Sequence, residues 1–166
     1  MAGRFAGFVL MFMAAVALAE DRAIDIKSEF RGVRFGADLT ADPEFREVGY
    51  LKNGDDHVYR RASDKMMLGP VRLFTLDYHA YKGRFWFASM TVLGDDDAVR
   101  VLTAAFGEPT RSEKGIKHEW LGKALAIVCY LPHDSVNTVI EIRGVSFDAA
   151  VQADKNKDAA SGKGDF

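Results

Sequence analysis

The sequence predicts an α+β domain, in which an antiparallel meander sheet carries one main helix, at about residues 95–106, packed on one face. Two observations favour this class. Residues 71–80 and 84–93 are both strand-like and only "YKG" separates them, which is typical of an antiparallel hairpin. One amphipathic segment follows this hairpin, and the remaining strand-like runs follow that segment.

The first half of the domain is rich in predicted strands. "HVYRRA" at 57–62 is one of them, "NGDD" at 53–56 is a turn before it, and "MLGP" at 67–70 breaks the chain before the hairpin. Strict alternation along the hairpin sends Trp86 to the face opposite Phe85 and Phe87. The core face is predicted to carry Phe74, Leu76 and Tyr78.

Aromatic side chains are thus expected on both faces of the sheet. The second face carries Trp86, together with Tyr59 or His79. Such a face is either covered by another layer, formed by the 117–142 strands or by the main helix, or it is an exposed patch that marks a partner or ligand surface.

The main helix is predicted from its ends and from its apolar stripe. Asp95 is a natural N-cap, and the "DDD" run that it opens suits the positive end of a helix better than it suits a metal site. Gly107 ends the helix. The apolar stripe consists of Val99, Leu102 and Phe106.

Three further elements follow the helix. "KHEWLG" and "ALAIVCYLP" form a second hairpin through the turn at Gly122 and Lys123. "NTVIEIRG" at 137–144 alternates as a strand, and Ser146 caps one short helix, "FDAAVQA".

Export is predicted from the first residues. Arg4 precedes an uncharged apolar run of 15 residues, and Ala17 and Ala19 form the small-x-small pattern of a cleavage site. We therefore expect residues 1–19 to be a signal peptide, cleaved near Ala19, and the mature protein to be periplasmic or secreted. An uncleaved N-terminal anchor is the alternative, although the run is shorter than the roughly 20 residues that span a bilayer.

The rest of the chain divides into a lead-in at 20–29, a single α+β domain at 30–152 and a polar tail at 153–166 that we expect to be disordered. No second apolar run reaches spanning length, so we expect no transmembrane segment in the mature chain. The net charge of −2 favours no binding to nucleic acid. Cys129 is the one cysteine, so the fold must depend on its core rather than on a disulfide.

The stretch "FRGVRFG", which begins at Phe30, raises the question of an anion site. Its two arginines suit one, but it lacks the GxGxxG order and the GK[ST] ending, and Pro43 leaves room for only about one helical turn behind it. We expect instead that Phe30 and Phe35 belong to the core, and that Gly32 and Gly36 permit a tight backbone path.

No sequence motif for catalysis is present. Asp77 and His79 share a strand face, so a dispersed acid/base site or a cation site would be built from them. Cys129 lies inside the apolar run "AIVCY", four residues before His133, which is typical of a buried cysteine rather than a nucleophile. We predict no catalytic residues, no metal and no cofactor.

Several of these stretches occur in a recurring order. "FRGVRFG" follows an FxGxx[FW]G pattern, and after it come "LGPVRLFTLDYHAYKGRFWFASMTVLG", a helix that ends in "AAFGEPT", and "HEWLGKALAIVCY". This layout, over about residues 28–143, resembles a functionally uncharacterised family of small exported bacterial periplasmic proteins. The resemblance implies a periplasmic or envelope location and an α+β fold, and it assigns no catalytic residues.

The leading hypothesis is an exported periplasmic or envelope domain that is a non-catalytic binding or accessory module for an envelope protein or a small ligand. One alternative is an enzyme that uses Asp77 and His79 in a cleft. Another is an envelope protein that self-associates as a homo-oligomer through an edge strand such as 137–144. The predicted contact surface consists of Tyr81, Lys82, Arg84, Trp86, His79 and Asp77.

Overall fold

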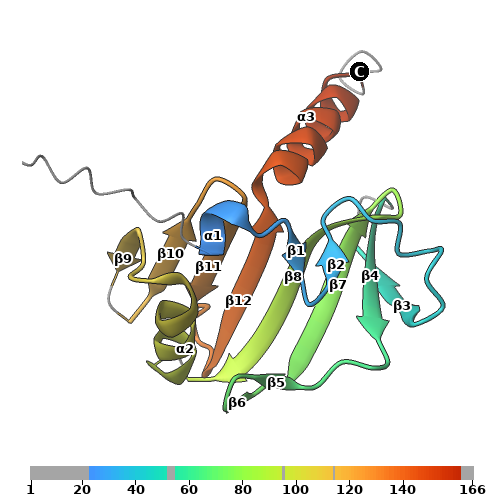
Figure 1. Cartoon of the computed structure of the whole chain (residues 1–166). Helices are drawn as coiled ribbons and strands as arrows, with labels where there is room; N and C mark the ends of the chain where they lie inside the picture. Colours follow the sequence, from blue (N-terminus) through green and yellow to red (C-terminus); the bar gives the residue numbers. More distant parts are fainter. Residues whose placement is uncertain (1–22, 52–54, 95, 114, 162–166) are drawn as a thin grey trace, which may run out of the picture.

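The structure is a computed structural model (Figure 1). Its described residues are 23–51, 55–94, 96–113 and 115–161. The predicted signal peptide at 1–19 and the predicted N-cap Asp95 lie outside them, as do part of the turn at 53–56 and the end of the predicted tail. Within the described residues, no helix has both the length and the apolar character needed to cross a membrane.

An antiparallel sheet of eight strands forms the centre of the described chain and confirms the predicted α+β class. Its strands are β3 (Phe45–Tyr50), β4 (Asp56–Arg61), β7 (Thr75–Tyr81), β8 (Arg84–Leu93), β9 (Arg111–Glu113), β10 (Lys117–Leu121), β11 (Leu125–Tyr130) and β12 (Asn137–Gly144). They lie side by side in the order β3-β4-β7-β8-β12-β11-β10-β9. The strands predicted at 84–93 and 137–144 are confirmed with those bounds.

Helices and two short hairpins surround this sheet in the described chain. They are α1 (Ala23–Ile26), α2 (Asp96–Phe106), α3 (Val145–Ser161), the hairpin of β1 (Glu29–Phe30) and β2 (Val33–Arg34), and the hairpin of β5 (Met67–Leu68) and β6 (Val71–Arg72). The main helix predicted at about 95–106 is confirmed as α2. Figure 1 shows α2 and α3 at opposite ends of the strands, because α2 follows β8 and α3 follows β12.

The main hydrophobic core lies between the sheet and three elements, α1, α2 and the β1–β2 hairpin. Met90 and Ile140 of the sheet are fully buried, and Leu102 of α2 packs into the same core. Ile24 of α1 is also fully buried there. The residues predicted as a loose lead-in at 20–29 therefore include part of the folded core, and the predicted domain start at residue 30 is too late.

"FRGVRFG" forms the first hairpin of the fold. Arg31 and Gly32 have φ values of 50° and 78°, which is the backbone of a two-residue type I′ turn. Phe30 is buried, and Phe35 stacks on Phe85 with ring centroids 4.7 Å apart. Both phenylalanines therefore contribute to the core, as the sequence predicts.

The strand predicted at 71–80 is divided between β6 and β7. Phe74 lies between these strands and is 56% exposed, so its predicted core position is wrong. Leu73 is buried instead. The irregular backbone between two strands does not follow the two-residue period, and this explains the exchange of faces.

A β-bulge in β8 changes the faces of its aromatic residues. His79 lies opposite Phe87 and Ala80 lies opposite Phe85, so Trp86 is the extra residue. Phe85 packs in the main core, whereas Trp86 and Phe87 share the other face, with ring centroids 4.5 Å apart. The prediction that Trp86 and Phe87 lie on opposite faces is wrong, because strict alternation requires a strand without a bulge.

Most of the tail predicted to be disordered is helical. The short helix predicted at "FDAAVQA" continues as α3 to Ser161, so the disorder predicted from residue 153 is wrong up to that point. Val151 of α3 is buried against the second sheet face, beside Trp86 and Phe87. The polar composition that suggested disorder belongs to a helix that the sheet holds in place.

β12 lies in the middle of the sheet, between β8 and β11. The prediction that 137–144 is an edge strand available for self-association is therefore wrong. The edges of the described sheet are β3 and β9. Alternating apolar residues occur in a central strand as readily as in an edge strand, when one face of an antiparallel sheet is polar.

Candidate functional site

Tyr81, Lys82 and Arg84, three of the predicted contact residues, lie at the turn between β7 and β8. Lys82 and Gly83 have φ values of 50° and 80°, so this is a second type I′ turn. The amide of Leu39 donates to the Gly83 carbonyl at 3.0 Å. The neighbouring segment thus holds the end of the hairpin in place through its backbone.

Helix α3 contacts this turn through acidic side chains. Asp154 accepts hydrogen bonds from Lys82 Nζ at 2.8 Å and from the Tyr81 hydroxyl at 3.1 Å. Asp158, one helical turn further, lies 3.5 Å from the same ammonium. The Lys82 hydrogen bond lowers the pKa of Asp154, and the same contact raises the pKa of Lys82. Both groups are charged at neutral pH, and this ion pair connects α3 to the hairpin.

A hollow of about 510 Å³, which we term the hairpin hollow, lies between α3 and this turn. It is lined by Tyr81, Lys82, Arg84, Phe147, Ala150, Val151, Ala153, Asp154 and Lys157. Arg84 Nη1 donates to the Gly36 carbonyl at 3.0 Å, which positions this guanidinium beside the hollow. The hollow therefore combines apolar side chains of α3 with three cations and one carboxylate.

Trp86 lies beneath α3 and does not line the hairpin hollow. Its side chain is 5% exposed, and two cations lie over its ring, Lys155 Nζ at 4.4 Å and the Arg143 guanidinium at 5.3 Å from the ring centroid. Lys155 also forms an ion pair with Asp56 at 2.6 Å. The layer that covers the aromatic residues of the second sheet face is thus α3, and Trp86 packs α3 on the sheet.

Asp77 and His79 have separate structural contacts. Asp77 accepts a hydrogen bond from Arg60 Nε at 2.6 Å, and His79 Nε2 lies 2.9 Å from Ser89 Oγ. The His79 ring stacks on Phe87, with centroids 3.8 Å apart. Burial lowers the pKa of His79 to about 4, so this imidazole is neutral at neutral pH. Neither residue lines the hairpin hollow, and the arrangement gives no support to an acid/base pair.

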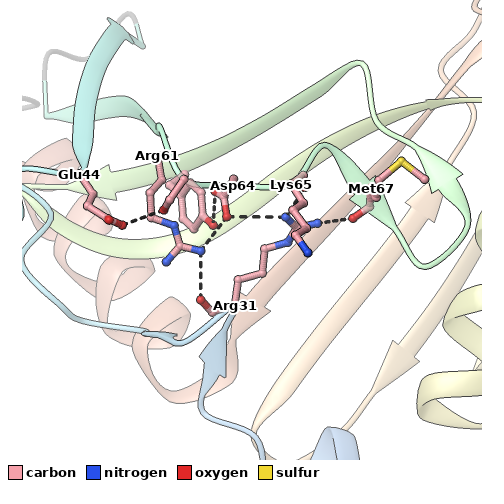
Figure 2. Close-up of polar contacts among 8 residues, drawn as sticks. Arg31, Glu44, Arg61, Asp64, Lys65 and Met67 are labelled. Carbon is pink, nitrogen blue, oxygen red and sulfur yellow. Dashed lines mark hydrogen bonds and ion pairs between the residues drawn. The ribbon is translucent and has the colours of Figure 1, made fainter.

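Figure 2 shows that Arg31 of "FRGVRFG" has structural contacts. Its guanidinium donates to the backbone carbonyls of Lys65 at 2.6 Å and of Met67 at 2.5 Å. It also lies 3.6 Å from the Asp64 carboxylate. Arg31 therefore joins the first hairpin to the segment that follows β4, which explains its place in the sequence without an anion site.

Asp64 is the common acceptor in the network of Figure 2. Its side chain is 5% exposed and accepts hydrogen bonds from Arg61 at 2.6 Å and from the Tyr78 hydroxyl at 2.7 Å. Burial raises the pKa of Tyr78, so the phenol keeps its proton and donates to Asp64. The contacts of this network are internal to the domain and stabilise the fold.

The remaining candidates for chemistry do not come together. Cys129 is buried in the main core, whereas the His133 side chain is 92% exposed. In the part of the chain that the structure describes, no group of three or more His, Cys, Asp or Glu side chains could hold a metal ion. Asp97 of the "DDD" run pairs with Arg100 at 2.8 Å.

The α3 side of the hairpin hollow was not predicted from the sequence. Phe147 and Val151 are one helical turn apart, and so are Asp154 and Asp158. This i, i+4 spacing is the signal that identifies one apolar and one acidic contact on a single helix. The polar composition of the region favours disorder instead, which is why composition alone does not reveal this helix.

Comparison with known proteins found no match, since no family model, curated protein or solved structure matches the chain. The resemblance of the sequence to a family of small exported periplasmic proteins therefore remains a prediction.

Proposed function

We propose that this protein is an exported envelope domain that acts as a non-catalytic binding module, and that its partner binds at the hairpin hollow. The observation that supports this most directly is the combination of an apolar α3 surface with the cations Arg84 and Lys157, beside the Lys82–Asp154 ion pair, in one concavity. Concave apolar surfaces with a few fixed polar groups are the usual form of binding sites. The partner is an envelope protein or a small envelope component that presents apolar surface and negative charge.

The rigidity of the site supports the same proposal. The type I′ turn and the Leu39 hydrogen bond to Gly83 hold the hairpin side of the hairpin hollow. The burial of Val151 against the sheet, together with the Lys82–Asp154 ion pair, holds the α3 side. A preformed site loses less conformational entropy on binding than a flexible one. Asp77 and His79, from which an acid/base site would be built, contact Arg60 and Ser89 instead.

Two alanine-to-arginine substitutions on α3 test the binding site. Ala153 lines the hairpin hollow, and Ala149 is an exposed residue of the same helix that does not line it. We expect Ala153→Arg to fill the hollow and abolish crosslinking to partners in envelope extracts, measured by quantitative mass spectrometry. Ala149→Arg, which adds the same side chain, should retain the crosslinks. Identical sets of crosslinked proteins for both variants would contradict the site.

Export is tested separately, by fractionation of cells and mass measurement of the isolated protein. We expect the protein in the periplasmic or secreted fraction, with a mass that corresponds to a first residue at Glu20. A cytoplasmic protein that retains residues 1–19 would contradict the export proposal and would leave the binding test unaffected.

A second candidate function is self-association, and exposed apolar residues at the sheet edge favour it. Val48 and Tyr50 of β3 are exposed, as is Leu51 directly after the strand. An edge strand with exposed apolar side chains is a template for pairing with another copy. Light scattering after size exclusion should then show a dimer that Tyr50→Lys converts to a monomer, and a monomeric wild-type protein would exclude this function.

A further inference from the structure

A second cavity lies on the opposite side of the sheet from the hairpin hollow, and the proposed function makes no use of it. It has a volume of about 330 Å³ and lies between α2, β1 and β5, over the central strands β11 and β12. Its apolar lining consists of four buried members of the main core (Phe30, Leu102, Leu125 and Ile142) and of the more exposed side chains of Leu68, Val101, Ala105 and Phe106. We term it the α2 cavity.

The α2 cavity has the size of a small ligand. The α2 cavity, at about 330 Å³, is open to solvent on one side and lies near the lower end of ligand pockets, which span roughly 300–1,000 Å³. It can therefore accept one short apolar chain, whereas the two chains of a phospholipid need more room.

Charged residues line the opening of the α2 cavity. Lys27 is exposed there, with its ammonium 6.0 Å from the centroid of the Phe106 ring. Arg31 also lines the cavity, but its guanidinium donates to two backbone carbonyls and pairs with Asp64. Glu29 lines the same opening and disfavours a ligand with several negative charges. This arrangement suits a single anionic group beside Lys27.

We propose that the α2 cavity binds a free single-chain amphipathic molecule, with an acyl chain in the cavity and a carboxylate beside Lys27. The apolar lining supplies the affinity, because burial of each methylene is favourable. The charge of Lys27 selects the anionic head and orients the chain. This proposal does not depend on the hairpin hollow, which lies on the other side of the sheet.

Decanoate is the probe for this proposal, with decanol and decyltrimethylammonium as uncharged and cationic analogues. Titration calorimetry on the purified protein should show decanoate bound more tightly than either analogue. Lys27→Glu should weaken decanoate about tenfold, because it replaces attraction by repulsion, and should leave decanol unchanged. Arg100→Glu is the matched control, since it makes the same charge change on α2, outside the cavity lining, and should have no effect.

A steric variant tests the position of the chain. Ala105 is an exposed residue of α2 that lines the cavity, so Ala105→Phe should occupy it without a change in the core. We expect this variant to lose decanoate and decanol together while it keeps the urea midpoint of the wild type.

Three results would overturn the proposal. They are a wild-type protein that does not bind decanoate, an Ala105→Phe variant that is folded and binds decanoate normally, and equal effects of Lys27→Glu and Arg100→Glu. Sedimentation with phosphatidylglycerol vesicles distinguishes the source of the chain, and we expect the protein to stay in the supernatant. Sedimentation with vesicles that Lys27→Glu abolishes would assign the site to membrane lipid and overturn the choice of a free ligand.

Discussion

We expect Asp64→Ala to destabilise the protein strongly, because this carboxylate is the common acceptor of the network in Figure 2. Asp64 is 5% exposed and accepts from Arg61 at 2.6 Å and from Tyr78 at 2.7 Å. The substitution leaves the guanidinium groups of Arg31 and Arg61, which are 20% and 17% exposed, without their shared counter-charge. It also leaves the fully buried Tyr78 hydroxyl without its acceptor.

The magnitude follows from these contacts. Removal of one partner of a buried ion pair costs about 3–5 kcal/mol, because the remaining charge is uncompensated. Both guanidiniums keep some contact with solvent, so we take the ionic part at about 2–3 kcal/mol. The unsatisfied Tyr78 hydroxyl adds about 1 kcal/mol. We expect the free energy of unfolding to fall by about 3–4 kcal/mol, a large share of the roughly 5–15 kcal/mol of a typical domain.

Urea denaturation followed by tryptophan fluorescence measures this loss. With a slope of about 1–3 kcal/mol per molar urea, the midpoint should fall by at least about 1 M, and the slope should stay constant. Asp97→Ala is the matched control, because its ion pair with Arg100 is short but Asp97 is 69% exposed, and it should cost less than about 1 kcal/mol. An equal loss of stability in Asp64→Ala and Asp97→Ala would contradict this prediction.

Three other changes have defined outcomes. Burial lowers the pKa of His79 from 6.5 to about 4 in the folded protein, so the unfolded chain takes up this proton first as the pH falls. The contribution of neutral His79 to stability is therefore fully present above pH 6.5 and is lost toward pH 4. Urea midpoints at these two pH values should show that the wild type loses on the order of 3 kcal/mol more than His79→Gln. Gly144→Ala should lower the stability measured by thermal unfolding by about 1–3 kcal/mol, because the added Cβ would lie 2.5 Å from Phe35 Cγ. Gly49→Ala is the control and should be nearly neutral, because a Cβ at Gly49 meets nothing within 4 Å. Val151→Ala should accelerate amide hydrogen exchange in α3 selectively, because Val151 is the buried contact of that helix with the sheet. Unchanged exchange would contradict this and would show that the ion pairs of α3 are enough to hold the helix on the sheet.

Local patterns predicted the strands and the main helix well. The runs at 84–93 and 137–144 are rich in β-branched and aromatic residues and have turn residues at their ends, so their bounds follow from the sequence. The strand order does not follow from these local patterns, because the pairing of Arg143 with Phe87 joins residues far apart in the chain. The bulge at Trp86 has the same origin, since the extra residue is defined only by the partner strand.

Only the hairpin side of the candidate site could be predicted from the sequence. The turn signal of "YKG" placed Tyr81, Lys82 and Arg84 together at a hairpin end, where the structure also has them. The α3 side depends on contacts of Asp154 and Phe147 with distant residues. Composition alone cannot distinguish a solvated helix held by such contacts from a disordered tail.

The central position of β12 has a consequence for the order in which this protein can fold. Among the strands of the described chain, β12 is the last in the sequence, and it alone joins β3, β4, β7 and β8 to β9, β10 and β11. A chain that emerges with its N-terminus first, from a ribosome or through a translocation channel, therefore holds two half-sheets with open edges until residue 144 is released. Such edges pair readily with other chains. The protein should therefore be most prone to aggregation just before its synthesis or translocation is complete, and truncation anywhere before residue 137 should prolong that state indefinitely.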